Sequence, residues 1–440
     1  MQPTSPWTTD RIRALVEPDR VHRDLYTHPE LFELERERFF ARTWQFAGHA
    51  SQMPQPGDYI TLEIAGRPLL LVRQADGRIL GFENRCAHKG AQLVTQPCGN
   101  TGKFLRCPYH AWTYKTDGAP LSIPLKTGYE GTRLSQCESG QGLTRLPHVQ
   151  VYRDFIFVRL SEQGVDFQTY FGPALQAIND LVDRSPTGEL RVEGGILRSV
   201  MNCNWKMYLE NINDTVHPVS THESAVRAAQ AVWSGHGPDD PKPMAVEQIL
   251  PFGGGYDFYD RMGARVHAHG HSVLGIHFSL HSAYSIPSDY RQALVSAHGE
   301  ARAQAVLEHA PQNAVLFPSL ALKGSPQVMR VIRPLAVDKT LIEAWCLRTV
   351  GAPDLMWERG LTYTRLVFSP MSVVAHDDIH LFESMQRGLQ ATGNPWISLH
   401  RNWREDDADL NDQAINGTNE LLMRNQFRAW QQVMTEGEGT

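Results

Sequence analysis

Two short pairs of cysteine and histidine constrain the fold of this chain more than any other feature of its sequence. One residue separates Cys86 from His88 and, after 18 residues, two residues separate Cys107 from His110. Closely spaced ligands on two loops can clamp one metal centre. Two thiolates with two imidazoles suit a structural zinc ion, or a [2Fe–2S] cluster with both cysteines on one iron and both histidines on the other. The spacing therefore predicts a small metal-stabilised domain.

The segments around these pairs have the pattern of short β-strands. Residues 59–64, 68–73 and 155–158 are rich in apolar and β-branched side chains, and Gly and Asp-Gly turns separate them. We expect an antiparallel β domain over residues 45–165. A helical segment over residues 1–44, including a helix at 30–42 with one charged face, should precede it and pack on the domain formed by residues 166–440.

The later part of the chain mixes strand and helix patterns. We expect strands over residues 195–201, 272–280, 327–333 and 341–347, helices over 205–214, 378–389 and 410–434, and a long loop over 230–270. The predicted fold class is α+β, with an all-β domain inserted near the front of a larger α+β domain.

Composition excludes several classes of protein. The 440 residues are 41% hydrophobic and 20% charged, which is ordinary for a folded protein. The net charge is −6, whereas nucleic-acid-binding proteins usually carry a basic surplus. No apolar run approaches the ~18–20 residues of a membrane span, and the N-terminus lacks a secretory pattern. We expect a cytoplasmic protein that binds neither nucleic acid nor membranes.

A second set of metal-binding residue types follows the β domain. Asp214 and His217 are three residues apart, so one helix would present both on one face. Pro218 would break that helix and let His222 turn back toward His217. Two imidazoles and a carboxylate form the facial triad of a non-haem Fe(II) site, which leaves positions open for O₂ and substrate.

The carboxylate of such a triad would come from distant sequence. Asp377 and Asp378 lie at the start of a predicted helix with an apolar stripe that includes Phe382 and Met385. Aspartates at a helix start also serve as caps or dipole partners. The spacing does not choose between Asp377 and Asp378.

These motifs together resemble a known family. Residues 84–90 (NRCAHKG) and 107–112 (CPYHAW) resemble the Rieske [2Fe–2S] family, and the Asp-x-x-His-x-x-x-x-His run at 214–222 is similar to the iron motif of Rieske non-haem iron oxygenase α subunits. The resemblance covers nearly the whole chain. It implies a Rieske domain over 45–165 that uses the four cysteines and histidines as cluster ligands. It also implies a catalytic domain over 166–440 of the helix-grip type, with an antiparallel sheet.

The resemblance also implies roles at the second centre. Asp214 would hydrogen-bond an iron-ligand histidine and lie on the electron's path from a neighbouring subunit. Glu210 and Asn211, one helical turn earlier, should face the iron pocket. The implied ligands of the mononuclear iron are His217, His222 and Asp378.

The implied activity is that of a terminal oxygenase. No dinucleotide-binding glycine motif is evident, so electrons from NAD(P)H would arrive through a separate reductase, directly or by way of a ferredoxin. The enzyme would use O₂ to cis-dihydroxylate an aromatic ring. Residues 21–26 and 44–49 are similar to those of dioxygenases acting on anthranilate and ortho-substituted benzoates, which implies an aromatic carboxylate substrate. The implied assembly is a homotrimer, alone or with a small β subunit as α3β3.

Three alternatives stay open at this point. A Rieske monooxygenase or demethylase would use the same two iron centres. An electron carrier would need only the first centre, and a zinc-stabilised binding module would have no redox role. If the substrate is a carboxylate, an arginine would anchor it. The candidates are Arg227, Arg261, Arg265 and Arg333.

Overall fold

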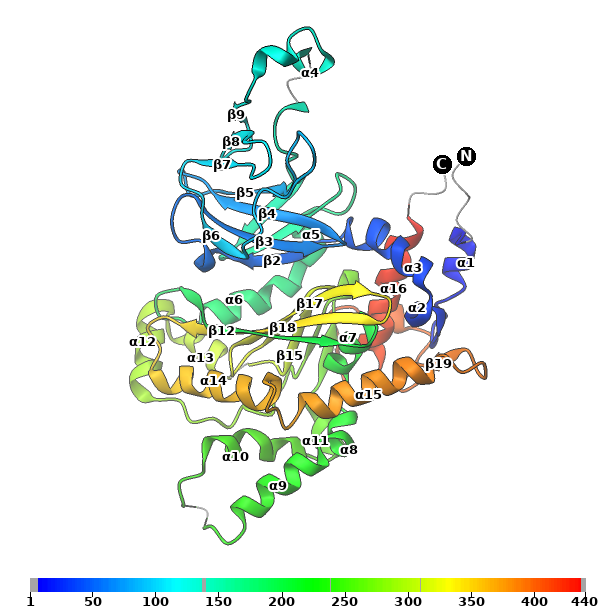
Figure 1. Ribbon diagram of the computed structural model, residues 1–440. Helices are drawn as coiled ribbons and strands as arrows, with labels where there is room; N and C mark the ends of the chain where they lie inside the picture. The colour runs from blue at the N-terminus through cyan, green and yellow to red at the C-terminus, as the bar shows by residue number, and fades with distance from the viewer. Residues whose placement is uncertain (1–6, 137–139, 238, 309, 437–440) are drawn as a thin grey trace. The chain divides into compact units, whose positions relative to one another are not determined.

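The chain divides into two compact units. The computed structural model of the protein describes residues 7–136, 140–237, 239–308 and 310–436. Residues 40–165 form one unit, here called the β unit, and residues 1–39 together with 166–440 form the other, here called the α+β unit (Figure 1). The outer ends of the predicted domains, at residues 1 and 440, lie outside the described residues.

The β unit consists of small antiparallel sheets. Their strand orders are β5-β4-β3-β6, β7-β8-β9 and β10-β11-β2. The strands are β2 (Gln45–His49), β3 (Asp58–Ile64), β4 (Arg67–Arg73), β5 (Ile79–Glu83), β6 (Cys98–Asn100), β7 (Phe104–Arg106), β8 (Thr113–Lys115), β9 (Pro120–Ser122), β10 (His148–Tyr152) and β11 (Phe155–Arg159). Short helical turns lie at η2 (Ala50–Gln52), η3 (Lys126–Tyr129) and α4 (Arg133–Gln136).

Strand β4 separates two apolar cores within the β unit. Successive side chains of a strand point to opposite faces. Leu69 and Leu71 pack into one core, and Leu70 and Val72 pack into the other. The second core also contains both predicted cysteine ligands, so the loops that carry them rest on one face of the β3–β4–β5 sheet.

An eight-stranded antiparallel sheet organises the described part of the α+β unit, in the order β12-β18-β17-β16-β15-β14-β13-β20. Helix α7 packs against β15 and β17, α14 packs against β18, and α16 packs against α7 and β13. The strands are β12 (Leu190–Met201), β13 (Ala264–Val266), β14 (Ser272–Leu274), β15 (Asn313–Leu316), β16 (Leu320–Lys323), β17 (Val328–Ala336), β18 (Lys339–Thr349) and β20 (Ala414–Ile415), with β1 (Arg20–His22) paired to β19 (Trp396–Ser398).

Helices surround this sheet, as Figure 1 shows. The α-helices are α1 (Thr9–Arg13), α2 (Asp24–Thr27), α3 (Pro29–Leu34), α5 (Phe167–Phe171), α6 (Gln176–Val182), α7 (Trp205–Asn213), α8 (His217–Thr221), α9 (Glu223–Trp233), α10 (Met244–Ile249), α11 (Tyr256–Arg261), α12 (Ser288–His298), α13 (Glu300–Glu308), α14 (Asp354–Phe368), α15 (Ala375–Gly388) and α16 (Leu421–Thr435). The predicted α+β class, with a β domain inserted ahead of a larger domain built on an antiparallel sheet, is confirmed. None of the helices in the described residues combines the length and apolar character needed to cross a membrane.

The expected helix at residues 30–42 differs from the structure in one important respect. Helix α3 continues into a π-helical segment at Glu35–Phe40, and Glu35 on the predicted charged face is buried. The Glu35 carboxylate accepts hydrogen bonds from the Nε1–H groups of Trp205 (3.0 Å) and Trp430 (2.7 Å) and pairs with the buried Lys206 ammonium. A charge this deep requires such partners, and none of them is near in sequence.

Three other predictions were wrong in detail. The expected loop at 230–270 contains α10 and α11, because Ile249, Phe252 and Tyr259 bury their side chains in a core shared with α9. The strand expected at 272–280 ends at Leu274, and the helix expected from residue 410 begins at Leu421.

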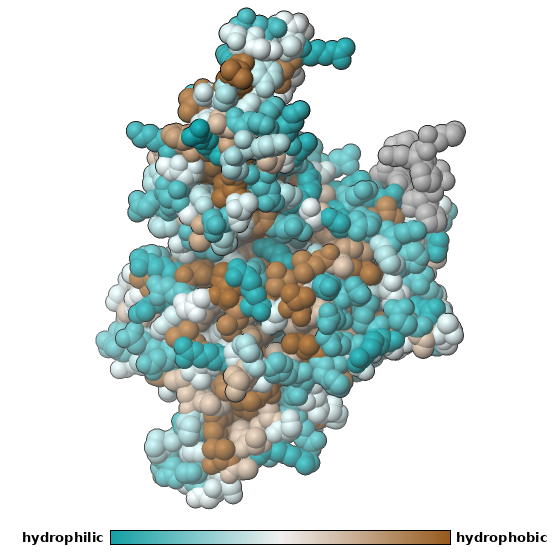
Figure 2. Space-filling view, viewed as in Figure 1, coloured by the Kyte–Doolittle hydropathy of each residue, from teal (hydrophilic) through white to brown (hydrophobic). Residues whose placement is uncertain are grey.

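Helix α15 does not bury the predicted apolar stripe. Phe382 is buried, but Met385 is 46% exposed. Other large apolar side chains of the α+β unit are also exposed, and Figure 2 shows apolar side chains gathered over the region of β12, β18 and α15. The exposed residues in question are Val200, Leu335, Met371, Val373 and Leu381. An exposed apolar surface of this kind is typical of an interaction site.

Candidate metal centres

The first centre lies on two loops that share one backbone pattern. In the first loop the N–H of Cys86 donates to the carbonyl oxygen of Ala91 (2.8 Å), and the N–H of Gly90 donates to the carbonyl oxygen of Cys86 (3.0 Å). In the second loop the N–H of Cys107 donates to the carbonyl oxygen of Trp112 (2.8 Å), and the N–H of Ala111 donates to the carbonyl oxygen of Cys107 (3.1 Å). Gly90 and Ala111 both have positive φ, 77° and 58°. Ala111 therefore holds a left-handed conformation that glycine would adopt at less cost.

The structure brings the four predicted cluster residues together. Cys86 and Cys107 are buried, while the rings of His88 and His110 lie nearer the surface with centroids 4.7 Å apart. The Nδ1 atom of His88 is buried without a hydrogen-bond partner in the described residues. Burial and the neighbouring His110 lower the pKa of His88, which favours the neutral imidazole that a metal ligand must be. Two buried cysteines with two more exposed histidines are a donor set that fits a [2Fe–2S] cluster, which these four residues would hold.

Tyr114 supports the inner end of this centre. Its hydroxyl accepts from the N–H of Ala87 (3.2 Å) and lies 3.1 Å from Sγ of Cys86. The hydroxyl hydrogen is therefore free to donate to the sulfur. Hydrogen bonds to cluster sulfurs are one way in which a protein sets the reduction potential.

The second centre begins where helix α7 ends. We expected Asp214 and His217 on one helix that Pro218 would break, and this was wrong. Asp214 is already extended (φ −101°, ψ 135°), and its side chain accepts from the backbone N–H groups of Val216 (3.1 Å) and His217 (2.8 Å) at the start of α8. Pro218 lies in the first turn of α8, where its missing N–H costs nothing.

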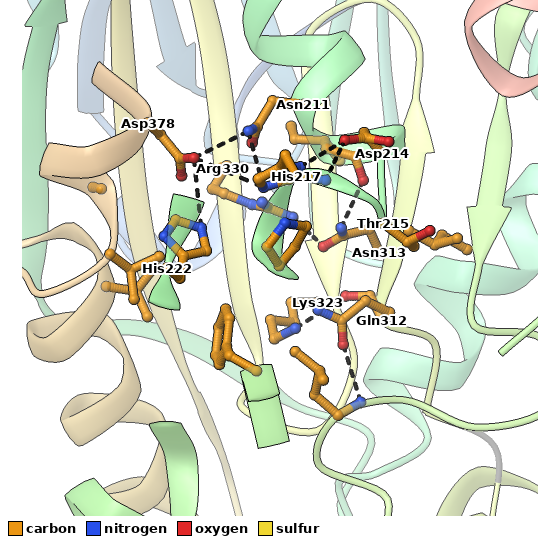
Figure 3. Close-up of a pocket in the computed structure, with 18 of the residues that line it drawn as sticks. Asn211, Asp214, Thr215, His217, His222, Gln312, Asn313, Lys323, Arg330 and Asp378 are labelled. Atoms are coloured by element: carbon orange, nitrogen blue, oxygen red, sulfur yellow. Dashed lines mark hydrogen bonds and ion pairs between the residues drawn. The ribbon is translucent and has the colours of Figure 1, made fainter. Parts of the chain in front are cut away.

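Each histidine of this centre is oriented by a carboxylate at Nδ1. Nδ1 of His217 is 2.9 Å from Oδ2 of Asp214, and Nδ1 of His222 is 3.3 Å from Oδ2 of Asp377. With Nδ1–H donating, each ring keeps a lone pair on Nε2. The two Nε2 atoms lie 3.7 Å and 3.5 Å from Oδ1 of Asp378 (Figure 3). One ligand atom from each of these three residues falls within 4.8 Å of the others.

The two consecutive aspartates of α15 therefore occupy different places. Neighbouring helical residues point about 100° apart. Asp378 faces both histidines, whereas Asp377 contacts the far nitrogen of His222. Burial raises the pKa of Asp378 despite the histidines, and burial also lowers the pKa of His222. A largely buried carboxylate with two imidazoles is a donor set that fits a divalent metal ion.

The two predicted pocket residues of α7 point in different directions. Nδ2 of Asn211 lies 3.1 Å from Nε2 of His217 and 3.1 Å from Oδ1 of Asp378, so it reaches the triad. Glu210 is absent from the described pocket lining and accepts a hydrogen bond from the hydroxyl of Tyr26 (2.8 Å). Burial raises the pKa of Glu210 to about 7.

A cavity extends from the triad. Its empty volume is about 720 Å³, part of which is open to solvent. The side chains around it are largely aromatic and aliphatic, with a polar group formed by Gln312, Asn313, Lys323 and Arg330 (Figure 3). The apolar lining includes Tyr208, Phe252, Tyr259, Leu274, Leu280, Tyr363, Val367, Phe368 and Val374.

Sequence reasoning missed the two cations of this cavity. Among the described residues, Arg330 is the only arginine that lines this pocket, and none of the four predicted arginines does. In the β16–β17 register Arg330 is opposite Ala321, and Lys323 is two residues along from Ala321 on the same face. The sequence offered one indication of this pair, a lysine at the end of the apolar strand β16. That lysine points to the pocket only once the register of β16 with β17 is known.

Comparison with known families agrees with both centres. The Rieske [2Fe–2S] domain matches residues 43–138. The catalytic domain of the ring-hydroxylating α subunits matches residues 186–436, more than half of the chain. The chain belongs to the ring-hydroxylating oxygenase α subunits. This α subunit is thus an oxygenase, an oxidoreductase with a Rieske cluster and a mononuclear iron that reacts with O₂.

Individual relatives span almost the whole α subunit. The anthranilate 1,2-dioxygenase large subunit of Acinetobacter baylyi is 30% identical, with 95% of this chain and 90% of that protein covered. The toluate 1,2-dioxygenase subunit alpha of Pseudomonas putida is 28% identical, with 97% and 94% covered. A solved naphthalene 1,2-dioxygenase with indole bound has the same fold, with a TM-score of 0.78, 22% identity, and 96% of this chain and 94% of that chain covered.

Proposed function

We propose that this α subunit is the terminal component that cis-dihydroxylates a substituted benzoate or a related aromatic carboxylate. A reductase would deliver electrons from NAD(P)H, directly or through a ferredoxin. The observation that carries the proposal is the position of His217, His222 and Asp378 beside a cavity with aromatic and aliphatic walls. Such walls suit a ring, and the names of the anthranilate and toluate dioxygenase relatives support a ring that bears a carboxylate.

We propose the following division of roles. Residues 45–165 form the domain that accepts the electron, through a cluster held by Cys86, His88, Cys107 and His110. Residues 166–440 form the domain that binds substrate, with residues 1–44 packed on it. When bound, the mononuclear iron supplies the activation of O₂.

The side chains of this chain would then act by holding and positioning. Asp214 and Asp377 hold the two histidines so that Nε2 of each faces Asp378. Asn211 spans His217 and Asp378. The apolar walls keep bulk water from the reacting ring. Each turnover joins one arene, one O₂, two electrons and two protons in one cis-dihydrodiol.

We also propose that the α subunit works as a homotrimer, alone or with a small β subunit as α3β3. The exposed apolar side chains over β12 and α15 support an association between chains. In such a trimer Asp214 would lie on the electron's path from a neighbouring subunit, because its carboxylate holds His217 and is itself only partly buried.

A single-turnover experiment tests the proposed reaction without a cognate reductase. The purified enzyme is filled with iron, reduced chemically, mixed with benzoate and exposed to ¹⁸O₂. A dihydrodiol with both oxygen atoms labelled is expected. Asp378→Ala should form none while keeping the spectrum of the cluster. Absence of any labelled product from the wild-type enzyme, across a panel of aromatic carboxylates and neutral arenes, would refute the proposal.

The same experiment separates the second candidate, a monooxygenase or demethylase. An N,N-dimethyl phenylurea N-demethylase subunit alpha of a Sphingobium species is 26% identical, with 88% of this chain and 83% of that protein covered. A product with one labelled atom, or loss of a methyl group from a methylated substrate, would favour this candidate.

A further inference from the structure

Two buried cations lie together in the pocket that holds the triad. Lys323, at the end of β16, is 2% exposed, and Arg330, on β17, is 8% exposed. The two residues project from the same face of the β16–β17 pair. Figure 3 shows both side chains reaching into the cavity beside His217 and His222.

Neither cation has an acidic partner within hydrogen-bond or ion-pair distance in the described residues. Nζ of Lys323 donates to the backbone oxygen of Gln312 (3.3 Å). Nη2 of Arg330 donates to Oδ1 of Asn313 (2.5 Å), and the guanidinium also contacts the hydroxyl of Tyr208. The buried Nε–H of Arg330 has no hydrogen-bond partner in the part of the chain that the structure describes.

Two other buried cations of the α+β unit are paired with carboxylates. Lys206 meets Glu35, and Arg424 meets Asp407. An unpaired buried charge costs several kcal/mol. Burial, and then the charge of Arg330, lowers the pKa of Lys323 well below its ordinary value. The two side chains therefore lack a negatively charged partner in the described residues, and a bound anion would supply one.

We propose that Lys323 and Arg330 form the carboxylate-binding subsite of this pocket and set its preference for anionic aromatic substrates. The free Nε–H of Arg330 and the ammonium of Lys323 offer charge-assisted hydrogen bonds to carboxylate oxygens. The rings of Tyr363 and Phe368 lie beside the two cations, 5.2 Å and 5.9 Å away, and provide an apolar wall for the substrate ring. The inference rests on the proposed function and adds to it the residues that select the substrate.

The test compares benzoate with benzamide, which has the same planar shape without the charge. The variants are Lys323→Met and Arg330→Met, each of which removes one cation and keeps an unbranched side chain. Arg333→Met is the matched control, because Arg333 lies on the same strand but faces Glu343 and not the pocket. Lys323→Gln and Arg330→Gln replace any methionine variant that loses the spectrum of the cluster.

Two measurements are made on the iron-loaded protein. Anaerobic calorimetry gives the Kd of each ligand, and single turnover of an equimolar mixture gives the ratio of products. Each pocket variant should weaken benzoate binding about 10- to 100-fold, the worth of a charge-assisted hydrogen bond, and benzamide binding less than about 3-fold. The product ratio should shift toward benzamide, whereas Arg333→Met should leave both measurements unchanged.

The outcomes separate this inference from the function on which it rests. Equal losses for benzoate and benzamide, or no loss for either, would overturn the subsite. A wild-type enzyme that oxidises no arene would overturn the proposed function, and the Kd values would still decide whether Lys323 and Arg330 bind the carboxylate.

Discussion

Replacing Asp214 with alanine should weaken the hold of this α subunit on its mononuclear iron. The carboxylate accepts from the backbone N–H (2.8 Å) and Nδ1 (2.9 Å) of His217, from the N–H of Val216 (3.1 Å) and from Arg401 (3.2 Å). Without it, the His217 ring loses the group that fixes its tautomer and direction. Loss of such a partner costs about 10- to 100-fold in metal affinity.

The same change should also reduce stability. Two N–H groups at the start of α8 lose their acceptor, and each loss costs about 1 kcal/mol as for a helix cap. Arg401 keeps Glu420 as a partner, so its share is small. We expect a loss of about 2–3 kcal/mol in the free energy of unfolding. The loss is no larger because the Asp214 side chain is 16% exposed, so water can reach the N–H groups that lose their acceptor.

Fe(II) titration of the metal-free protein measures the affinity, and denaturant unfolding measures the stability. Asp377→Ala is the matched control, because Asp377 makes one contact with His222 at 3.3 Å and is 34% exposed. Asp377→Ala should lower the Fe(II) affinity and the stability less than Asp214→Ala does. The cluster spectrum should be unchanged in both variants, and Asp214→Ala should stay inactive when excess Fe(II) refills the site. Unchanged affinity in Asp214→Ala, or a larger loss in Asp377→Ala, would refute this reasoning, and wild-type turnover would refute the electron path.

Three further predictions concern the cluster, pH and the buried charges. Cys86→Ser should abolish the visible Rieske spectrum, whereas Cys98→Ser, at an exposed position on β6, should not; an intact spectrum in Cys86→Ser would mean that the ligands are misassigned. Burial lowers the pKa of His271 and of His281 to about 3, so the unfolded chain binds more protons as the pH falls below 6.5. These two rings should therefore contribute about 3 kcal/mol per pH unit to the loss of stability in acid, followed by urea unfolding, and a flat profile from about pH 6 to 4 would contradict the burial of these neutral rings. Glu35→Ala should cost about 3–5 kcal/mol by denaturant unfolding, since it leaves a buried lysine unpaired, and a loss below about 1 kcal/mol would show that the pair is not needed.

Local patterns in the sequence were enough to find much of this site. The cysteine and histidine pairs at residues 86–110 are separated by spacings that metal chemistry requires, so they could be recognised without any tertiary information. The choice of Asp378 over Asp377 could not be made in that way and depended on the family resemblance. The structure places them on opposite sides of His222, which reflects the direction of α15 and not its composition.

Features that depend on distant pairing were out of reach. The burial of Glu35 requires Trp430, which lies 395 residues away in sequence. The meeting of Lys323 and Arg330 requires the register of β16 with β17. The helix break at Asp214 was missed because its side chain caps the next helix, and this competes with helix continuation.

The most direct test of the two iron centres is the iron content of the wild-type protein and of Asp378→Ala, measured with the low-temperature EPR spectrum of each reduced protein. We expect three irons per chain in the wild type and two in the variant, with the same Rieske signal in both. Three irons in Asp378→Ala, or a wild-type protein that still holds two after Fe(II) is added, would contradict a mononuclear centre built from His217, His222 and Asp378.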